Sequence, residues 1–322
     1  MPFNDLLVHI TIFLISCIVL AKSAEFLVKS LTKIASFLGW TEFAIGFIIM
    51  AIATSVPELF VGITSALNKN SALALGTVIG SNIVDLTLVI GIVALLAKGI
   101  RIESKTIRTD TLYMFGIATL PVILMVQGNE ISRFDGYLLL SVFFLYVIKL
   151  LKQKGRFRKA IDTVPIKEFF SAIGLSCFSI VVLFFSSDFV VRYASLLSID
   201  LMLPPILIGL FVIAFGTSLP ELTFEIKAVR TGHRGMALGD LLGSVIANST
   251  LVLGVTALIY PIDADFLLFL TSASFMLLVA FLFVTFTESE EMISWQEGIA
   301  LILLYVFFVI VELNVRLLQV SM

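Results

Sequence analysis

One stretch of this chain occurs twice, and this duplication limits what the chain can fold into. When the sequence is shifted by 163 positions, Gly46–Gly91 falls on Gly209–Gly254 without a gap, with 18 identities in 46 positions. Each copy holds a Thr-Ser-x-Pro-Glu core, at Thr54–Glu58 and at Thr217–Glu221. A fixed sequence period is typical of repeated structural units, so we expect two equivalent halves.

The composition places both copies in a membrane. The chain has 322 residues, of which 59% are hydrophobic and 14% charged, and its mean hydropathy is +1.11. A soluble domain carries about a quarter charged residues. Long apolar runs between short polar hinges favour helices over a barrel, whose strands would alternate. The net charge of −2 indicates no nucleic-acid partner. The two cysteines lie in apolar runs, which favours packing over a disulfide framework.

Ten membrane spans are predicted, near residues 6–33, 41–68, 72–97, 109–127, 134–152, 168–197, 204–230, 235–259, 264–286 and 294–318. They divide into an N-terminal five-helix repeat (1–152), a basic cytoplasmic linker (153–166) and a C-terminal five-helix repeat (167–322). Five is an odd number, so the second repeat enters the membrane upside down, as in many secondary transporters. The predicted fold class is therefore an all-α polytopic membrane protein with ten transmembrane helices in two inverted repeats.

Basic residues predict the orientation in the cell membrane. With both termini outside, the loops after spans 1, 3, 5, 7 and 9 face the cytoplasm. These loops and the adjoining span ends carry sixteen of the 21 Lys and Arg residues, as the positive-inside rule requires. Only Lys69, Arg133, Arg192 and Arg316 fall on the outer side, and Lys22 lies within the first span.

The repeated core has the chemistry of a cation site. Pro57 and Pro220 each remove a backbone donor and break the helix, which frees carbonyls near Thr54 and Thr217 to line a cavity. The hydroxyls of Ser55 and Ser218 and the carboxylates of Glu58 and Glu221 add further oxygen atoms. Such a set suits a hard cation, and calcium fits better than magnesium because its coordination is larger and more flexible. Sodium can use the same oxygens.

The next span of each half adds a second polar stripe. Thr77, Ser81 and Asp85 are four residues apart and share one helix face, and their repeat mates are Asp240, Ser244 and Asn248. Glycines at positions 76, 80, 239 and 243 predict close helix contacts. We expect a central ring of Glu58, Glu221, Asp85 and Asn248, backed by serines.

These residues resemble the cation/calcium exchanger superfamily, whose sodium/calcium exchangers carry two such repeats. The resemblance rests on the Thr-Ser-x-Pro-Glu cores and on the Gly-Ser-x-Ile-x-Asp/Asn elements at Gly80–Asp85 and Gly243–Asn248. It implies a calcium site made by Glu58 and Glu221 with the carbonyls of Thr54 and Thr217. It also implies flanking sodium sites, made by Ser55, Ser81, Ser218 and Ser244 together with Asp85, Asn248 and the two glutamates. Spans 1 and 6 are expected to slide across the other eight.

The chain departs from the superfamily pattern in two ways. The Asp and the Asn of the Gly-Ser elements are exchanged, since Asp85 lies in the first half and Asn248 in the second. The second half also has surplus charge, because the mates of Glu225 and Asp240 are Gly62 and Thr77. Our hypothesis is that Glu225 and Asp240 form an acidic inner vestibule that attracts calcium. The alternative is that Lys227, Arg230 and Arg234 neutralise them.

The sequence thus predicts a transporter that is not an enzyme. The first hypothesis is an antiporter that exchanges sodium for calcium by alternating access, normally exporting calcium, as a monomer in the lipid bilayer and without a cofactor. A proton/calcium or other divalent-cation antiporter is the alternative, and a cation channel or an intramembrane enzyme is a further one. Structural alternatives also remain for the residues: a kink with an interhelical hydrogen bond at the glutamates, and helix packing for the serines.

Overall fold

The structure is a computed structural model that describes residues 3–37, 54–102, 105–152, 165–232, 234–289 and 292–321. The first half contains α1 (Phe3–Phe37), α3 (Val56–Leu67), α4 (Ser71–Val84), η2 (Asp85–Val89), α5 (Ile90–Ala97), β1 (Ile100–Arg101), α6 (Lys105–Gly128) and α7 (Arg133–Lys152). The second half contains α8 (Ile166–Asp200), α9 (Pro205–Leu207), η3 (Ile208–Ile213), α10 (Ala214–Thr217), α11 (Leu219–Arg230), α12 (Arg234–Ala247), η4 (Asn248–Val252), α13 (Leu253–Ile259), α14 (Phe266–Ser289), β2 (Met292–Ile293) and α15 (Trp295–Ser321). Most of the predicted linker, residues 153–164, lies outside the described residues.

The 163-residue period of the sequence is also a period of the structure. Four pairs of elements begin and end at positions that differ by 163: α1 and α8, α3 and α11, α4 and α12, and η2 and η4. Two short β contacts follow nearly the same relation, since Ile100 pairs with Ile293 and Ile131 pairs with Ile262. Each of these contacts joins one half to the other. The predicted equivalence of the halves is therefore confirmed for these elements.

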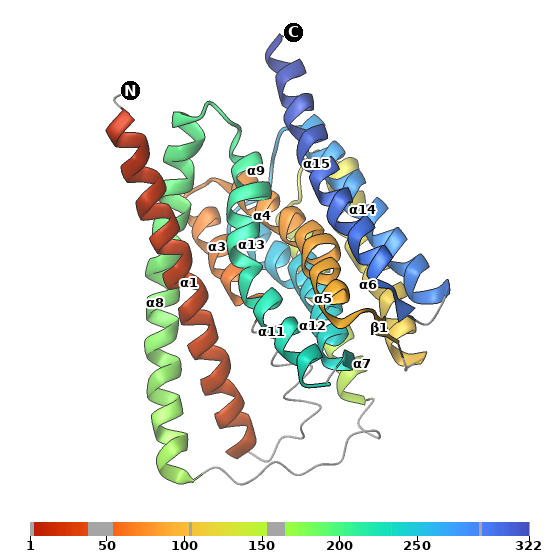
Figure 1. Cartoon of the computed structure of the whole chain (residues 1–322). Helices are drawn as coiled ribbons and strands as arrows, with labels where there is room; N and C mark the ends of the chain where they lie inside the picture. Colours follow the sequence, from red (N-terminus) through yellow and green to blue (C-terminus); the bar gives the residue numbers. More distant parts are fainter. Residues whose placement is uncertain are drawn as a thin grey trace.

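The long helices α1 and α8 form an antiparallel pair at one side of the molecule (Figure 1). His9 Nδ1, near the start of α1, lies 2.6 Å from Asp200 Oδ2 at the end of α8. At the other end Lys33 Nζ lies 3.0 Å from Glu168 Oε2. The two helices pack with α3 and η3 in a smaller hydrophobic core that is separate from the main one. α1 and α8, which are equivalent helices of the two halves, thus run in opposite directions.

The middle of the molecule is made by the spans that carry the repeated motifs. In the apolar 18-residue window of Ser71–Ala97, 83% of the residues are buried, against 28% in that of Asp5–Ile34 in α1. A Cβ on Gly80 would lie 2.3 Å from the Leu210 carbonyl oxygen, and one on Gly76 would lie 2.1 Å from that of Ile206. Backbones of the two halves therefore touch here, which confirms the close contact predicted for these two glycines.

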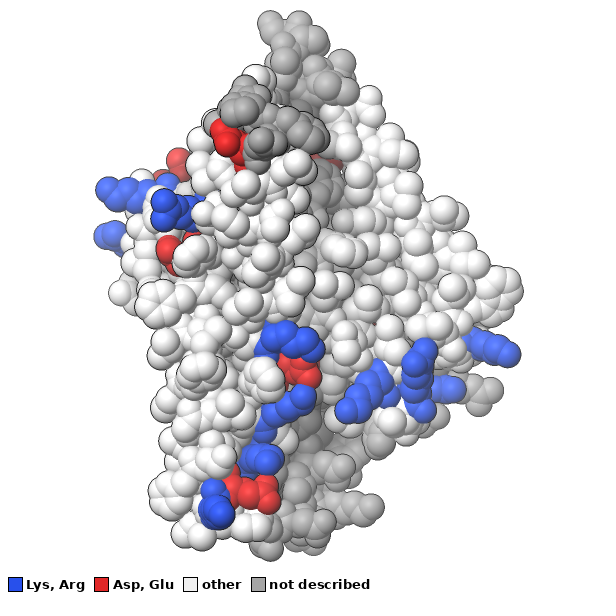
Figure 2. Space-filling view, turned by 60° about the vertical axis from the view of Figure 1, so that its left-hand side comes forward, with Lys and Arg blue, Asp and Glu red and all other residues white. Residues whose placement is uncertain are grey.

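The described helices are those of a multi-pass membrane protein. Eight of them are long and apolar enough to cross a bilayer. The predicted span near 41–68 is described only from Thr54 onward, where α3 has 12 residues, and the 20-residue α7 is not among the eight. Most of the face drawn in Figure 2 carries no charge, as lipid contact requires.

Candidate cation site

One helix ends and another begins beside the second proline. α10 ends at Thr217 and α11 begins at Leu219 with Pro220 in its first turn, so Ser218 stands between two helices. In the first copy α3 begins at Val56, and Pro57 again lies in the first turn. Ser55 and Ser218 have nearly the same backbone angles, with φ −78° and −83° and ψ 3° for both. The chain before Thr54 in the first copy lies outside the described residues.

Each break places a glutamate at the start of a helix. Glu58 and Glu221 lie in the first turns of α3 and α11, and each side chain is only 1% exposed. The start of a helix carries free N–H groups and a partial positive charge, which stabilise a carboxylate. The break and the carboxylate therefore belong to one local arrangement, repeated in both halves.

Crossed hydrogen bonds bring the two motif copies together. Thr54 Oγ1 lies 2.9 Å from Ser244 Oγ, and Ser81 Oγ lies 3.3 Å from Thr217 Oγ1. These two contacts are repeat mates, because 54 and 81 shifted by 163 give 217 and 244. Ser81 Oγ also donates to Glu58 Oε1 at 3.3 Å. Each Thr-Ser-x-Pro-Glu core thus meets the Gly-Ser element of the opposite half.

Asp85 and Asn248 occupy equivalent positions at the centre. Each is the first residue of a π-helical turn, η2 or η4, and each is 1% exposed. Such turns are rare and frequently mark functional sites. All four residues of the predicted ring are therefore buried, in α3, η2, α11 and η4.

Two residues of this region escaped the sequence prediction. Asn82 Nδ2 donates to Ser249 Oγ at 3.0 Å, and both side chains are fully buried. Asn82 directly follows the Ser81 of the Gly-Ser element, and Ser249 directly follows Asn248. Polar residues beside the motif within an apolar helix were the available signal. This bond joins the two halves at the level of the π-helical turns.

The surplus acids of the second half lie deeper than the vestibule hypothesis implies. Glu225 is 0% and Asp240 2% exposed, and Thr54 Oγ1 donates to Asp240 Oδ1 at 3.1 Å. Neither residue lines an open vestibule in this conformation, and such a role stays a prediction for a conformation open to that side. The suggested neutralisation by nearby bases is not seen, since both Glu225 oxygens lack a hydrogen-bond partner. Lys227 and Arg230 are exposed instead.

The region is electrostatically unbalanced. Five buried carboxylates lie in it, those of Glu58, Asp85, Glu221, Glu225 and Asp240. The buried side chains of the described residues include no Lys, Arg or His. Buried charges are costly unless they are paired or bind a metal ion, so the cluster favours cations.

The cluster would hold a metal ion with more than carboxylates. Within the described ranges, no three Asp, Glu, His or Cys side chains come together closely enough to hold a metal ion by themselves. Coordination that is completed by hydroxyl and backbone oxygens stays a prediction from the sequence. Free buried oxygens remain on Glu58, Glu221, Asp240 and Asn248, one on each residue. The donors are all oxygen or amide groups, which suits hard cations.

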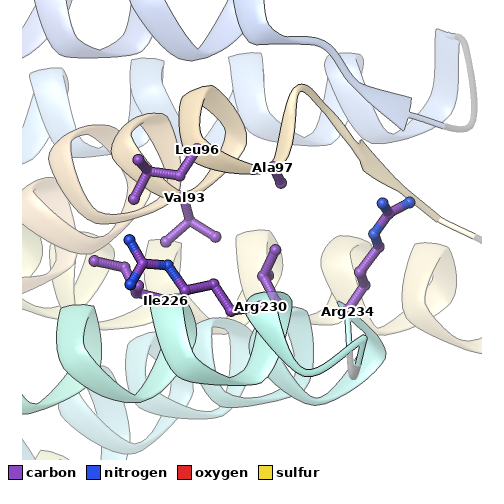
Figure 3. Close-up of a pocket in the computed structure, with 7 residues that line it drawn as sticks. Val93, Leu96, Ala97, Ile226, Arg230 and Arg234 are labelled. Atoms are coloured by element: carbon purple, nitrogen blue, oxygen red, sulfur yellow. The ribbon is translucent and has the colours of Figure 1, made fainter.

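A cavity of about 170 Å³ lies apart from these carboxylates, between α5 and α11 (Figure 3). Apolar residues line most of it, together with Arg230 and Arg234. No acidic side chain is among its lining residues. Its chemistry is therefore not that of a cation site.

Comparison with known proteins decides the family. The sequence profile of the sodium/calcium exchanger protein family matches residues 8–152 and 171–314. The chain belongs to the sodium/calcium exchanger family. Both matched segments contain one copy of the repeated motif, so the membership covers both halves. It is a family of transporters, which confirms that the chain is not an enzyme.

Relatives of this exchanger-family chain match along most of its length. The sodium/calcium exchanger MaX1 of Methanosarcina acetivorans is 29% identical over 349 residues, covering 94% of this chain and 98% of the relative. The putative antiporter CaxA of Alkalimonas amylolytica is 33% identical over 266 residues, covering 79% and 82%. The inner membrane protein YrbG of Escherichia coli is 29% identical over 291 residues, covering 86% and 88%.

Solved structures share the fold of this exchanger-family chain. A structure of the sodium-calcium exchanger NCX_Mj has a TM-score of 0.68 at 24% identity, covering 94% of this chain and 98% of that one. The H+/Ca2+ exchanger CAX has a TM-score of 0.77 at 16% identity, covering 97% and 88%. At such low identity these likenesses establish the architecture alone.

Proposed function

We propose that this protein is a secondary antiporter that exchanges sodium for calcium across the cell membrane and normally exports calcium. The observation that carries the proposal is the crossed contact of the repeats, Thr54 with Ser244 and Ser81 with Thr217. It brings both glutamate-bearing helix starts to one buried acidic region. Family membership and the relative named as a sodium/calcium exchanger support the same function.

The proposed mechanism follows from charge. Glu58 and Glu221, with the carbonyls of Thr54 and Thr217, bind calcium. Ser55, Ser81, Ser218 and Ser244, with Asp85 and Asn248, complete sodium sites that share the two glutamates. A carboxylate cluster without cations crosses a bilayer poorly because buried charge is costly. Only the ion-bound protein then switches between the inward-facing and outward-facing conformations, and the two ions are exchanged.

The proposed architecture is ten transmembrane helices in two inverted repeats, with both termini outside and a monomer as the working unit. Support for the inversion comes from the antiparallel α1–α8 pair. The smaller core of this pair suits helices that slide as a unit past the rest. The basic loops support the orientation.

Ion coupling is tested by calcium uptake into proteoliposomes. We expect radiolabelled calcium to enter when an outward sodium gradient is imposed, and to stay outside with a pH gradient alone. Uptake driven only by the pH gradient would establish the alternative, a proton/calcium antiporter, for which the likeness in fold to CAX is the specific observation. Uptake that needs no counter-ion would indicate a channel.

A further inference from the structure

The two halves differ in charge at one place in the cation region. Glu225 of α11 has Gly62 of α3 as its mate, and Asp240 of α12 has Thr77 of α4. The mate position of Glu225 has no room for a side chain, because a Cβ on Gly62 would lie 2.5 Å from Thr256 Oγ1. The second half therefore holds two carboxylates where the first half is closely packed and neutral.

The hairpin of α11 and α12 brings these two carboxylates to one level. α11 ends at Arg230 and α12 begins at Arg234. Glu225 lies five residues before the end of α11, and Asp240 lies six residues after the start of α12. Thr54 Oγ1 donates to Asp240 Oδ1 at 3.1 Å and lies 2.9 Å from Ser244 Oγ, so Asp240 is next to the motif of the first half. The pair thus adjoins the central ring.

Three of the four carboxylate oxygens of this pair have no hydrogen-bond partner in the described part of the protein. Both carboxylate oxygens of Glu225 and the Oδ2 of Asp240 are buried without a hydrogen-bond partner. The other oxygen of Asp240 accepts a hydrogen bond from the Thr54 hydroxyl. In the part of the chain that the structure describes, no ion pair joins either acid to Lys227, Arg230 or Arg234. Like charges that are buried together without a cation repel strongly.

Charge counting favours more than one cation when all five carboxylates are ionised. Five ionised carboxylates give −5, and one calcium ion in the central ring leaves −3. The described core holds no buried base to offset this remainder. A second divalent ion leaves −1, which is the charge that the ring of Glu58, Asp85 and Glu221 would have with one calcium ion bound. An ion of its own would thus balance the surplus pair when both of its carboxylates are ionised.

We propose that Glu225 and Asp240, together with the Thr54 hydroxyl, form a second hard-cation site beside the transport site and only in the second half. The site rests on the proposed function, since it feeds the antiporter from the side to which the α11–α12 turn faces. Its ligand is a calcium or a sodium ion, because both bind carboxylate and hydroxyl oxygens. A cation bound at Glu225, one helical turn from Glu221, would lie next to the transport site.

The test counts bound cations on the purified full-length protein. Equilibrium dialysis with radiolabelled calcium forms one arm, and radiolabelled sodium in saturating calcium forms the other. The variant Glu225→Gly with Asp240→Thr installs the residues of the first half, and Glu225→Gln with Asp240→Asn keeps the side-chain volumes. Glu312→Gln is the control, since Glu312 is a buried acid that bonds Thr271 away from the cluster.

We expect both double variants to lose one bound cation per chain and the control to lose none. Loss in the calcium arm identifies a second calcium site, and loss in the sodium arm identifies a sodium site. Unchanged counts in both arms, in a double variant that elutes as folded protein, would overturn the proposal. Failure of the proposed function is distinguished by a different measurement. In that case the unaltered protein would show no sodium-driven calcium uptake, while its number of bound cations would stay the same.

Discussion

The hairpin α3–α4 and the hairpin α11–α12 have the same helix lengths and spacing but carry different side chains at several positions. Their helices begin and end at positions 163 residues apart, and both present a glutamate in the first turn after a proline break. They differ at Gly62 against Glu225, Thr77 against Asp240 and Asp85 against Asn248. The shared residues build a symmetric cation region, and the differing residues give its second half more charge. The repeated residues thus determine the arrangement of the helices, and the residues that differ determine the charge of each half.

The largest effect is expected where the hairpins agree. Glu58→Gln and Glu221→Gln should each lower sodium-driven calcium uptake at least ~100-fold, because removing one buried charged partner costs roughly 3–5 kcal/mol. The two losses should be similar, since the glutamates are repeat mates with equal burial. Uptake by proteoliposomes measures both. A tenfold difference between them would show that the symmetric pair is functionally unequal.

Smaller effects, on stability, are expected where the hairpins differ in packing. Substitutions at the two mate positions Gly62 and Glu225 should change the stability in opposite directions. Gly62→Ala should destabilise the protein by about 1–3 kcal/mol, because its Cβ would overlap Thr256 Oγ1. Glu225→Gln should instead raise the stability of the cation-free protein by removing a buried, unpartnered charge. Thermal unfolding in detergent without added cations measures both. Equal destabilisation by the two variants would contradict the contrast.

The exchange of Asp85 and Asn248 allows a reciprocal test. Asp85→Asn and Asn248→Asp should each change the apparent sodium affinity roughly tenfold, by about 1.4 kcal/mol. The double variant moves the carboxylate to the equivalent place in the other half and should recover part of this loss. Sodium dependence of calcium uptake is the readout. Strict additivity of the single effects would show that the positions act independently.

The smallest effect is expected from the exposed bases of the second hairpin. Arg230→Leu installs the residue of the first half, Leu67, at an exposed position. Calcium uptake and stability should stay within about twofold and about 0.5 kcal/mol, because surface charges away from a site contribute little. A large loss of uptake would mean that Arg230 compensates Glu225 and would restore the neutralisation hypothesis.

Most of the cation region was predictable, and the exceptions have a common cause. Glu58, Glu221, Ser81 and Ser244 were found because a polar group in an apolar span is conspicuous. Asp240 was expected nearer the cytoplasm, although its place one turn before Ser244 on the same helix face pointed to the cluster. No sequence pattern indicates that Thr54, 186 residues away, donates a hydrogen bond to Asp240. Helical periodicity predicts which residues share a face but not which helix packs on that face.

The sequence by itself determined the membrane helices, the two equivalent halves, the proline break and the oxygen chemistry of the motif. These depend on hydropathy, period and side-chain type, all of which are local. The tertiary structure decided that the motifs cross between halves, that Glu225 and Asp240 are buried rather than exposed, and that Lys227 and Arg230 are exposed. The reason is physical: burial and pairing are properties of helix packing, and packing depends on contacts between residues that are distant in the chain.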